Sequence, residues 1–275
     1  MTKIGIFIPC YNVANSITKV LNSFSPATLA VISEVVVVDN CSQDKTFQIL
    51  RDIQVSGSPV GNRLVIIKNK ENYGLGGSQK IAYRYFLTEK FSHFLIVHGD
   101  NQGNGEEIAQ KFLKSFREKF DLDLIVASRF TKSSDVSRYN RLRVAGNYLF
   151  NFLTYVLTGE NMTDSGAAIL FYRTEILENF PFEHLTNSFQ FNPELNILLY
   201  KDKRLKILEV PLNWSDSDDK SNIRAMNYCW TLLKILMRFR WNKTFMRKSG
   251  WALFHRESQA IMPQFEIIRT VSPKF

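Results

Sequence analysis

Cysteines are few in this sequence, and they fall in no metal-binding or disulfide pattern. The three, Cys10, Cys41 and Cys229, lie far apart, and an odd number argues against a disulfide framework. The sequence also lacks a G-x-G-x-x-G motif after its first apolar run and a Walker-type lysine loop. Without these motifs the sequence lacks the main signature of dinucleotide-binding and P-loop proteins. The cysteine pattern, in turn, predicts a reducing, cytoplasmic setting.

No apolar run is long enough to cross a membrane. The opening MTKIGIFIPCYN has no small-residue cleavage site, so it predicts a first strand and not a signal peptide. Residues 144–158 and 223–241 are apolar but carry a polar side chain every three or four positions, which predicts helices with a narrow polar stripe. Both helices could pack on the sheet or on each other, and 223–241 could instead lie at a bilayer interface.

Acidic residues are scarce in the last part of the chain. Residues 220–275 hold 11 Lys and Arg against 2 acidic residues, which accounts for the whole net charge of +9. This excess of positive charge could be only a solvated basic face. Otherwise it predicts an anionic partner, either nucleic acid or a membrane surface. We therefore expect an α/β domain over residues 1–215 and a basic, aromatic-rich helical extension over residues 216–275.

Apolar runs alternate with helical patterns through the first 130 residues. Strands are expected at 3–9, 32–40, 63–69, 93–100 and 122–130. Because these strands are apolar throughout and are separated by helices of about ten residues or more, they predict a mostly parallel sheet covered on both faces. This pattern is typical of a doubly wound α/β fold.

Polar side chains follow each of these runs, where open α/β sheets bind their ligands. After the fourth run, His98, Asp100 and Gln102 stand at alternate positions, so an extended chain would project all three to one side. Their oxygens and imidazole predict a site for Mn²⁺ or Mg²⁺, with Mn²⁺ favoured because it accepts nitrogen more readily. His98 could equally be a hydrogen-bond partner that never touches the metal.

Five motifs in order give the chain a family resemblance. They are IPCYN, VVVDNCSQDKT, ENYGLGGSQKIA, HGDNQ and ASRF, and the similarity continues to VPLNW near residue 215. Together they resemble glycosyltransferase family 2 enzymes of the GT-A fold, especially the dolichol-phosphate-mannose-synthase-like branch. The resemblance implies the GT-A α/β fold, a nucleotide-sugar donor and a divalent metal.

The family's roles are implied residue by residue. Asp44 would shape the loop after the second strand, and the metal would be held by Asp100 and Gln102, with His98 standing where the family has an aspartate. The donor would be bound by Pro9, Tyr11, Asn12, Asp39, Gly74, Asp100 and Arg129.

Catalytic candidates are Asp164, Glu194 and Arg129. In the family Arg129 would face the donor phosphates, and either carboxylate could be the base. An inverting transfer is a single displacement, so a hydroxyl acceptor needs a carboxylate to take its proton. A phosphate acceptor is already anionic and needs none. Asp164 could instead cap a helix or a loop, and Glu194 could be a charge at a helix N-terminus.

These observations predict an inverting, metal-dependent transfer of a sugar, with UDP favoured as the donor nucleotide, to a glycan or polyprenyl-linked acceptor in surface polysaccharide synthesis. A polyprenyl-phosphate sugar synthase is the alternative, although SDSDDKSNIR replaces the R-x-x-G-x-S-K pattern of such enzymes. A sugar nucleotidyltransferase, a nucleic-acid-binding module and a non-catalytic relative are less favoured. We expect no nucleic-acid partner, and peripheral contact with the inner face of a membrane through the basic extension.

Overall fold

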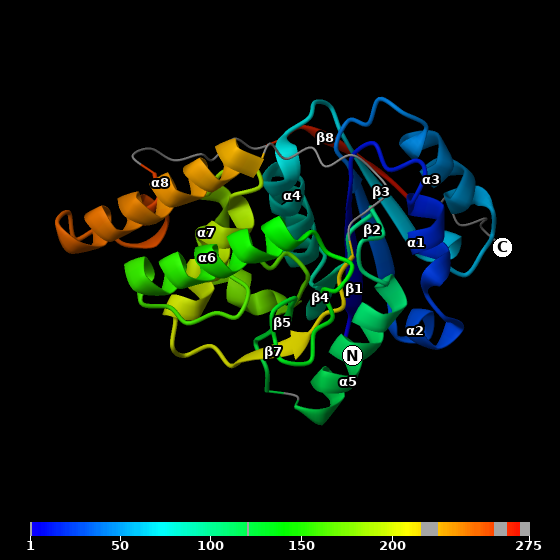
Figure 1. Cartoon of the computed structure of the whole chain (residues 1–275). Coiled ribbons are helices and arrows are strands. Elements are labelled where there is room, and N and C mark those ends of the chain that lie inside the picture. The colour runs from blue at the N-terminus through cyan, green and yellow to red at the C-terminus, as the bar shows by residue number, and fades with distance from the viewer. Residues whose placement is uncertain (1, 120, 216–224, 256–262, 270–275) are drawn as a thin grey trace.

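The computed structural model describes residues 2–119, 121–215, 225–255 and 263–269 and shows a sheet between two layers of helices (Figure 1). The strands are β1 (Ile4–Cys10), β2 (Glu34–Asp39), β3 (Leu64–Asn69), β4 (His93–Ile96), β5 (Leu124–Ser128), β6 (Leu170–Arg173), β7 (Ile207–Pro211) and β8 (Phe265–Ile268). The α-helices are α1 (Ile17–Ser23), α2 (Pro26–Val31), α3 (Thr46–Val55), α4 (Gly74–Thr88), α5 (Gly105–Glu118), α6 (Arg141–Thr158), α7 (Phe191–Lys201) and α8 (Ala225–Thr244).

The eight strands form one sheet in the order β7-β5-β6-β4-β1-β2-β3-β8. Strands β1 to β4 pair in parallel, and β5 pairs in parallel with β7. The expected mostly parallel sheet is therefore confirmed. Sequence reasoning expected five strands and missed three. Strand β6 lies antiparallel between β4 and β5, β7 pairs with β5, and β8 lies antiparallel beside β3.

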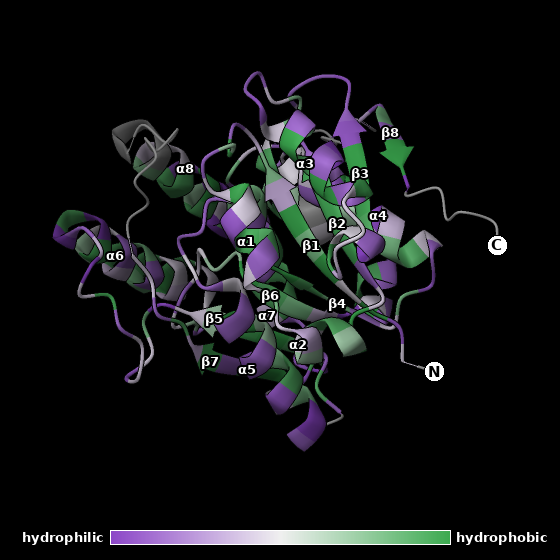
Figure 2. Cartoon of the chain, turned by 90° about the vertical axis from the view of Figure 1, so that its right-hand side faces the viewer, coloured by the Kyte–Doolittle hydropathy of each residue, from purple (hydrophilic) through white to green (hydrophobic). Residues whose placement is uncertain are grey.

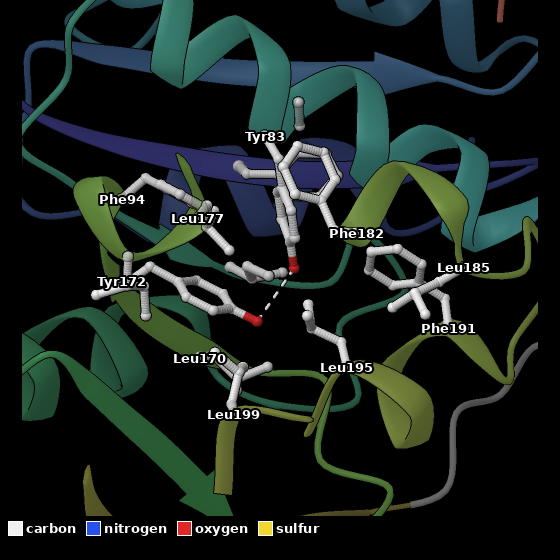
Figure 3. Packing of buried hydrophobic residues seen from close by; sticks show 14 of the residues in the cluster. Tyr83, Phe94, Leu170, Tyr172, Leu177, Phe182, Leu185, Phe191, Leu195 and Leu199 are labelled. Carbon is white, nitrogen blue, oxygen red and sulfur yellow. Dashed lines mark hydrogen bonds between the residues drawn. The ribbon is translucent and has the colours of Figure 1, made fainter. Parts of the chain in front are cut away.

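Each face of the sheet has its own hydrophobic core. One core lies under α1, α2, α3 and α5, and the other lies under α4, α7 and α8. In the second core the rings of Tyr83, Phe94 and Tyr172 pack together, and the Tyr83 hydroxyl donates to the Tyr172 hydroxyl at 3.2 Å (Figure 3). Because both faces are sealed, polar chemistry is left to the strand ends.

Residues on both sides of position 215 contribute to this architecture. Strand β8 extends the sheet beside β3, and α8 packs along α6. The basic extension therefore lies against the α/β domain wherever it is described, while 216–224, 256–262 and 270–275 lie outside the described residues. Among the helices that the structure describes, none has the length and apolarity to cross a membrane.

Two helical glycines provide a test of how tightly α4 packs. A Cβ on Gly76 would lie 2.6 Å from the carbonyl oxygen of Thr186 and 2.7 Å from Cβ of Phe191, whereas one on Gly146 in α6 would meet nothing within 4 Å. We expect Gly76→Ala to lower the free energy of unfolding by about 1–3 kcal/mol through overpacking. Gly146→Ala, the matched control, should raise it by up to about 1 kcal/mol through helix propensity. Urea unfolding measures both, and equal effects would contradict the close approach.

Candidate active site

Parallel pairing brings the ends of the strands to one edge of the sheet. Cys10 at the end of β1 pairs with Asp39 at the end of β2, and Asp39 pairs with Lys68 of β3. Cys10 is buried, and its thiol pKa is raised well above the usual value by burial and then by the charges of Asp39, Asp100 and Asp44. Carboxylates from the end of β2, from the loop that follows it and from the turn after β4 therefore lie around the end of β1.

The loops that follow β1 and β2 are joined by hydrogen bonds. The backbone N–H of Asn12 donates to Oγ of Ser42 at 3.0 Å, and the N–H of Gln43 donates to Oδ1 of Asn12 at 2.8 Å. Asp44 accepts the N–H of Ala14 at 3.1 Å and the N–H of Thr46 at 2.9 Å. Burial raises the pKa of the Asp44 carboxyl, but hydrogen bonds from Thr46 first and then from Ala14 lower it on balance. Asn12 is held in the left-handed region at φ 54°. Pro9 and Tyr11 lie beside this junction and are partly exposed.

Asp39 is a buried carboxylate in which only one of the two oxygens is hydrogen-bonded within the described residues. Its Oδ1 accepts the N–H of Ser42 at 3.3 Å, while Oδ2 has no hydrogen-bond partner among the described residues. Burial raises the pKa of this carboxyl. Because an unpaired buried acceptor is costly, a ligand N–H or O–H that reached Oδ2 would recover that cost. Such a bond would fit the donor-binding role that the resemblance implies for Asp39.

Sequence reasoning missed a partly buried amide network next to Asp39. Oδ1 of Asn40 accepts from Nδ2 of Asn69 and from the N–H of Tyr73, both at 2.9 Å. Nδ2 of Asn40 donates to Oδ1 of Asn72 at 2.7 Å. This network fixes the loops after β2 and β3. The only sequence signal for it was three asparagines, each at or just after the end of a strand.

The segment after β4 does not continue as an extended chain. The strand ends at Ile96, residues 99–100 form a turn, and Asn101 has φ 57°. Oδ1 of Asp100 accepts the backbone N–H of Gln102 at 3.2 Å, which closes the turn. The expected alternation of His98, Asp100 and Gln102 along one face was therefore wrong, because a turn and not a strand presents them.

His98 has the features of a neutral imidazole with an open nitrogen. Its Nε2 is buried and lacks a hydrogen-bond partner among the described residues. Burial lowers its pKa, partly opposed by the nearby charge of Asp100 and by a hydrogen bond with the backbone of Ala168. An unprotonated imidazole nitrogen beside a carboxylate fits a divalent cation.

The protein ligands for such a cation would be few. Within the part of the chain that the structure describes, no three His, Cys, Asp or Glu side chains gather as a metal site. His98, Asp100 and Gln102 could hold the ion only if substrate oxygens or water completed its shell, which hard cations commonly accept.

Arg129 and Asp164 form a bidentate ion pair. Nε of Arg129 lies 2.8 Å from Oδ2 of Asp164, and its Nη2 lies 2.8 Å from Oδ1. The side chain of Asp164 is 1% exposed and that of Arg129 is 14% exposed. Oδ1 of Asn147 in α6 also lies 3.4 Å from Nη2 of Arg129. Asp164 therefore fixes the guanidinium at the end of β5, and both of its carboxylate oxygens are engaged by Arg129.

Trp214 lies between His98 and Arg129 and contacts both. Sequence reasoning did not single it out as a site residue. Its ring contacts His98 edge to face, with centroids 6.4 Å apart, and lies 5.8 Å from the guanidinium carbon of Arg129. The charge of Arg129 also acts on His98 and lowers its pKa. His98, Asp100, Arg129 and Asp164 are thus brought together at one edge of the sheet.

Glu194 and Gly74 belong to a different cluster. Glu194, in the first turn of α7, is fully buried, and its Oε2 accepts the N–H of Thr186 at 3.0 Å. Its Oε1 lies 3.0 Å from Nε2 of His255. Gly74 has φ 73°, and a Cβ there would lie 2.4 Å from the carbonyl oxygen of Asn187. Both residues pack the loop before α7 against the neighbouring elements.

Comparison with known proteins identifies the family of this chain. The model of the family described as "Glycosyl transferase family 2" matches residues 5–180. The chain belongs to glycosyl transferase family 2. Its fold is accordingly the GT-A type, and the expected class of enzyme, a glycosyltransferase, is confirmed.

Curated relatives and solved structures agree with this assignment. The chain is 26% identical over 231 residues to a dolichyl-phosphate β-glucosyltransferase of Dictyostelium discoideum, which covers 78% of this chain and 67% of the relative. It is 22% identical over 217 residues to a UDP-N-acetylglucosamine–dolichyl-phosphate N-acetylglucosaminyltransferase of Methanococcus voltae, covering 76% and 84%. Glucosyl-3-phosphoglycerate synthase of Mycobacterium tuberculosis, solved with Mn²⁺, UDP and phosphoglyceric acid, shares the fold with a TM-score of 0.61 at 14% identity, covering 88% and 78%.

The ion pair predicts that Asp164 is needed for stability. Asp164→Asn should lower the free energy of unfolding by about 3 kcal/mol, because it leaves the Arg129 charge largely buried without its partner. Asp121→Asn breaks an exposed pair with Lys206 and should leave unfolding unchanged. Urea unfolding of both variants measures this. A fully stable Asp164→Asn protein without activity would point instead to a free catalytic base.

Proposed function

We propose that the chain transfers a sugar, with inversion, from a nucleotide diphosphate donor to the phosphate of a polyprenyl lipid. The observation that carries the choice of acceptor is the state of the two candidate bases. Asp164 is paired with Arg129, and Glu194 lies buried against His255. A hydroxyl acceptor would require one of them to take a proton, whereas a phosphate oxygen attacks without a base. The curated relatives are named for dolichyl-phosphate acceptors, which supports this choice.

In this proposal each residue at the edge of the sheet binds a different part of the donor. Asp39 Oδ2 accepts a hydrogen bond from the base or the ribose, and the guanidinium of Arg129 faces the diphosphate. His98, Asp100 and Gln102 would hold a divalent cation, which when bound supplies positive charge against the leaving diphosphate. Asp164 and Asn147 act as positioning residues because they set the direction of the guanidinium.

UDP is the proposed donor nucleotide, and Mn²⁺ the proposed ion. The relative in Methanococcus voltae is named for a UDP-sugar, and the solved neighbour holds UDP with Mn²⁺. The unpaired nitrogen of His98 also favours Mn²⁺ over Mg²⁺. A glycan hydroxyl acceptor in surface polysaccharide synthesis is the second candidate, and it would require Asp164 or Glu194 to leave its partner.

The donor site predicts nucleotide binding that depends on metal. A ligand at 100 times its dissociation constant stabilises the folded state by about 2.7 kcal/mol. We expect UDP with Mn²⁺ to raise the unfolding temperature more than UDP alone, and GDP to have less effect. Asp100→Ala should lose the part that depends on Mn²⁺, while Asp52→Ala, an exposed carboxylate on α3, should keep it. Unchanged Mn²⁺ dependence in Asp100→Ala would remove Asp100 from the metal site.

The acceptor can be tested with two lipids that differ by one group. With UDP-glucose or UDP-N-acetylglucosamine as donor, we expect sugar transfer to a polyprenyl phosphate and none to the polyprenol of the same chain length. Radiolabelled transfer to the lipid phase measures this. Equal transfer to both lipids would show that the phosphate is not required, and transfer only to a glycan would show that the acceptor is a hydroxyl.

A further inference from the structure

Helix α6 carries its polar stripe inward and its apolar side outward. Asn151 donates from Nδ2 to the carbonyl oxygen of Thr163 at 2.6 Å and accepts the N–H of Ser165 at 2.8 Å, and Thr154 and Thr158 are buried. The opposite side of the helix leaves large apolar side chains in solvent. They are Leu142, Tyr148, Leu149, Phe152, Tyr155 and Val156. A surface helix normally faces the other way.

Helix α8 adds a second exposed apolar stripe beside the first. The helix packs along α6, and Lys243 near its end donates to the carbonyl oxygen of Thr158 at 3.3 Å. Its solvent side, with the residues just after it, exposes Trp230, Met237, Trp241, Phe245 and Met246. These two stripes hold most of the exposed large apolar side chains that the structure describes. We call these eleven residues the α6–α8 surface.

Both views show α6 and α8 together on one side of the molecule, away from β8 and α3 (Figures 1 and 2). The charges on these helices have one sign. Residues 138–158 and 225–250 contain nine Lys and Arg and no Asp or Glu. Lys234 lies over the ring of Trp230, with 5.5 Å between Nζ and the ring centroid. Exposed Trp, Tyr and Phe side chains among Lys and Arg are typical of elements that lie at the interface of an anionic bilayer.

We propose that the α6–α8 surface binds an anionic lipid bilayer, with the two helices lying in the plane of the interface. The charge is complementary to acidic headgroups, and the Tyr and Trp side chains of the surface have the apolar body and polar tip that the interface accepts. A second copy of the chain is a poorer fit, because it would oppose basic residues to basic residues across a two-fold interface.

The same helix connects this surface to the site. Asn147 and Asn151 on the inner side of α6 contact Arg129 and the backbone on either side of Asp164. A bilayer on the outer side would therefore lie one helix diameter, about 10 Å, from these groups. A functional role for this short distance between bilayer and site rests on the proposed lipid-phosphate acceptor. Binding of the α6–α8 surface to a bilayer does not depend on that proposal.

Vesicle sedimentation tests the surface with the full chain. We expect binding to vesicles of phosphatidylcholine with phosphatidylglycerol, weaker binding to phosphatidylcholine alone, and weakening by salt. Phe152→Asp with Trp241→Asp, at positions 60% and 59% exposed, should reduce binding at least about tenfold, because each puts a carboxylate against the interface. Val55→Asp on α3, 69% exposed and far from the surface, is the matched control and should bind as the wild type does.

Light scattering and thermal unfolding complete the test. An unchanged unfolding temperature and UDP response in the double variant would show that fold and donor site are intact. The proposal is overturned if the wild-type chain ignores vesicles, if the double variant binds as well as Val55→Asp, or if the double variant only converts a dimer to a monomer. A donor site that fails to bind nucleotide would instead defeat the proposed function and leave vesicle binding as it is.

Discussion

The ion pair between Arg129 and Asp164 is the interaction on which the arrangement of this site depends. It joins the end of β5 to the loop before β6, and α6 contacts Arg129 through Asn147 and the backbone on either side of Asp164 through Asn151. Since both charges are largely out of water, the pair is stable only while each keeps its partner. The strand end, the loop and the helix are consequently held as one unit around the guanidinium.

The parallel half of the fold could be predicted because its signals are local. The β-branched run EVVVVD contains its own evidence, and β2 begins and ends within two residues of the strand expected at 32–40. Strands β6 and β8 could not be found in this way. They are four residues long and antiparallel, and β8 owes its place to residues that lie far from it in sequence.

The site could be predicted in outline but not in its contacts. The motifs picked out Asp39, Asp100, Arg129 and Asp164 as a group, and the fold does gather them at one edge. Periodicity did not reveal that Asp164 would form an ion pair with Arg129. The pair depends on the antiparallel course of β6 beside β5, which brings the loop before β6 next to the end of β5. Nor did periodicity reveal which side of α6 faces solvent. A stripe of four polar side chains predicts a helix with two unlike sides, and only tertiary structure decides which side is buried.

Strand β8 also bears on how the chain acquires its fold. It covers the edge of β3 from roughly two hundred residues further along, a pairing of high sequence separation that adds to the time needed to reach the native state. Until residues 265–268 have been synthesised, the backbone N–H and C=O groups along that edge lack a strand partner. An open, apolar sheet edge is a template for association with other chains. Once they are in place, the residues that complete the sheet therefore also protect the finished chain from aggregation.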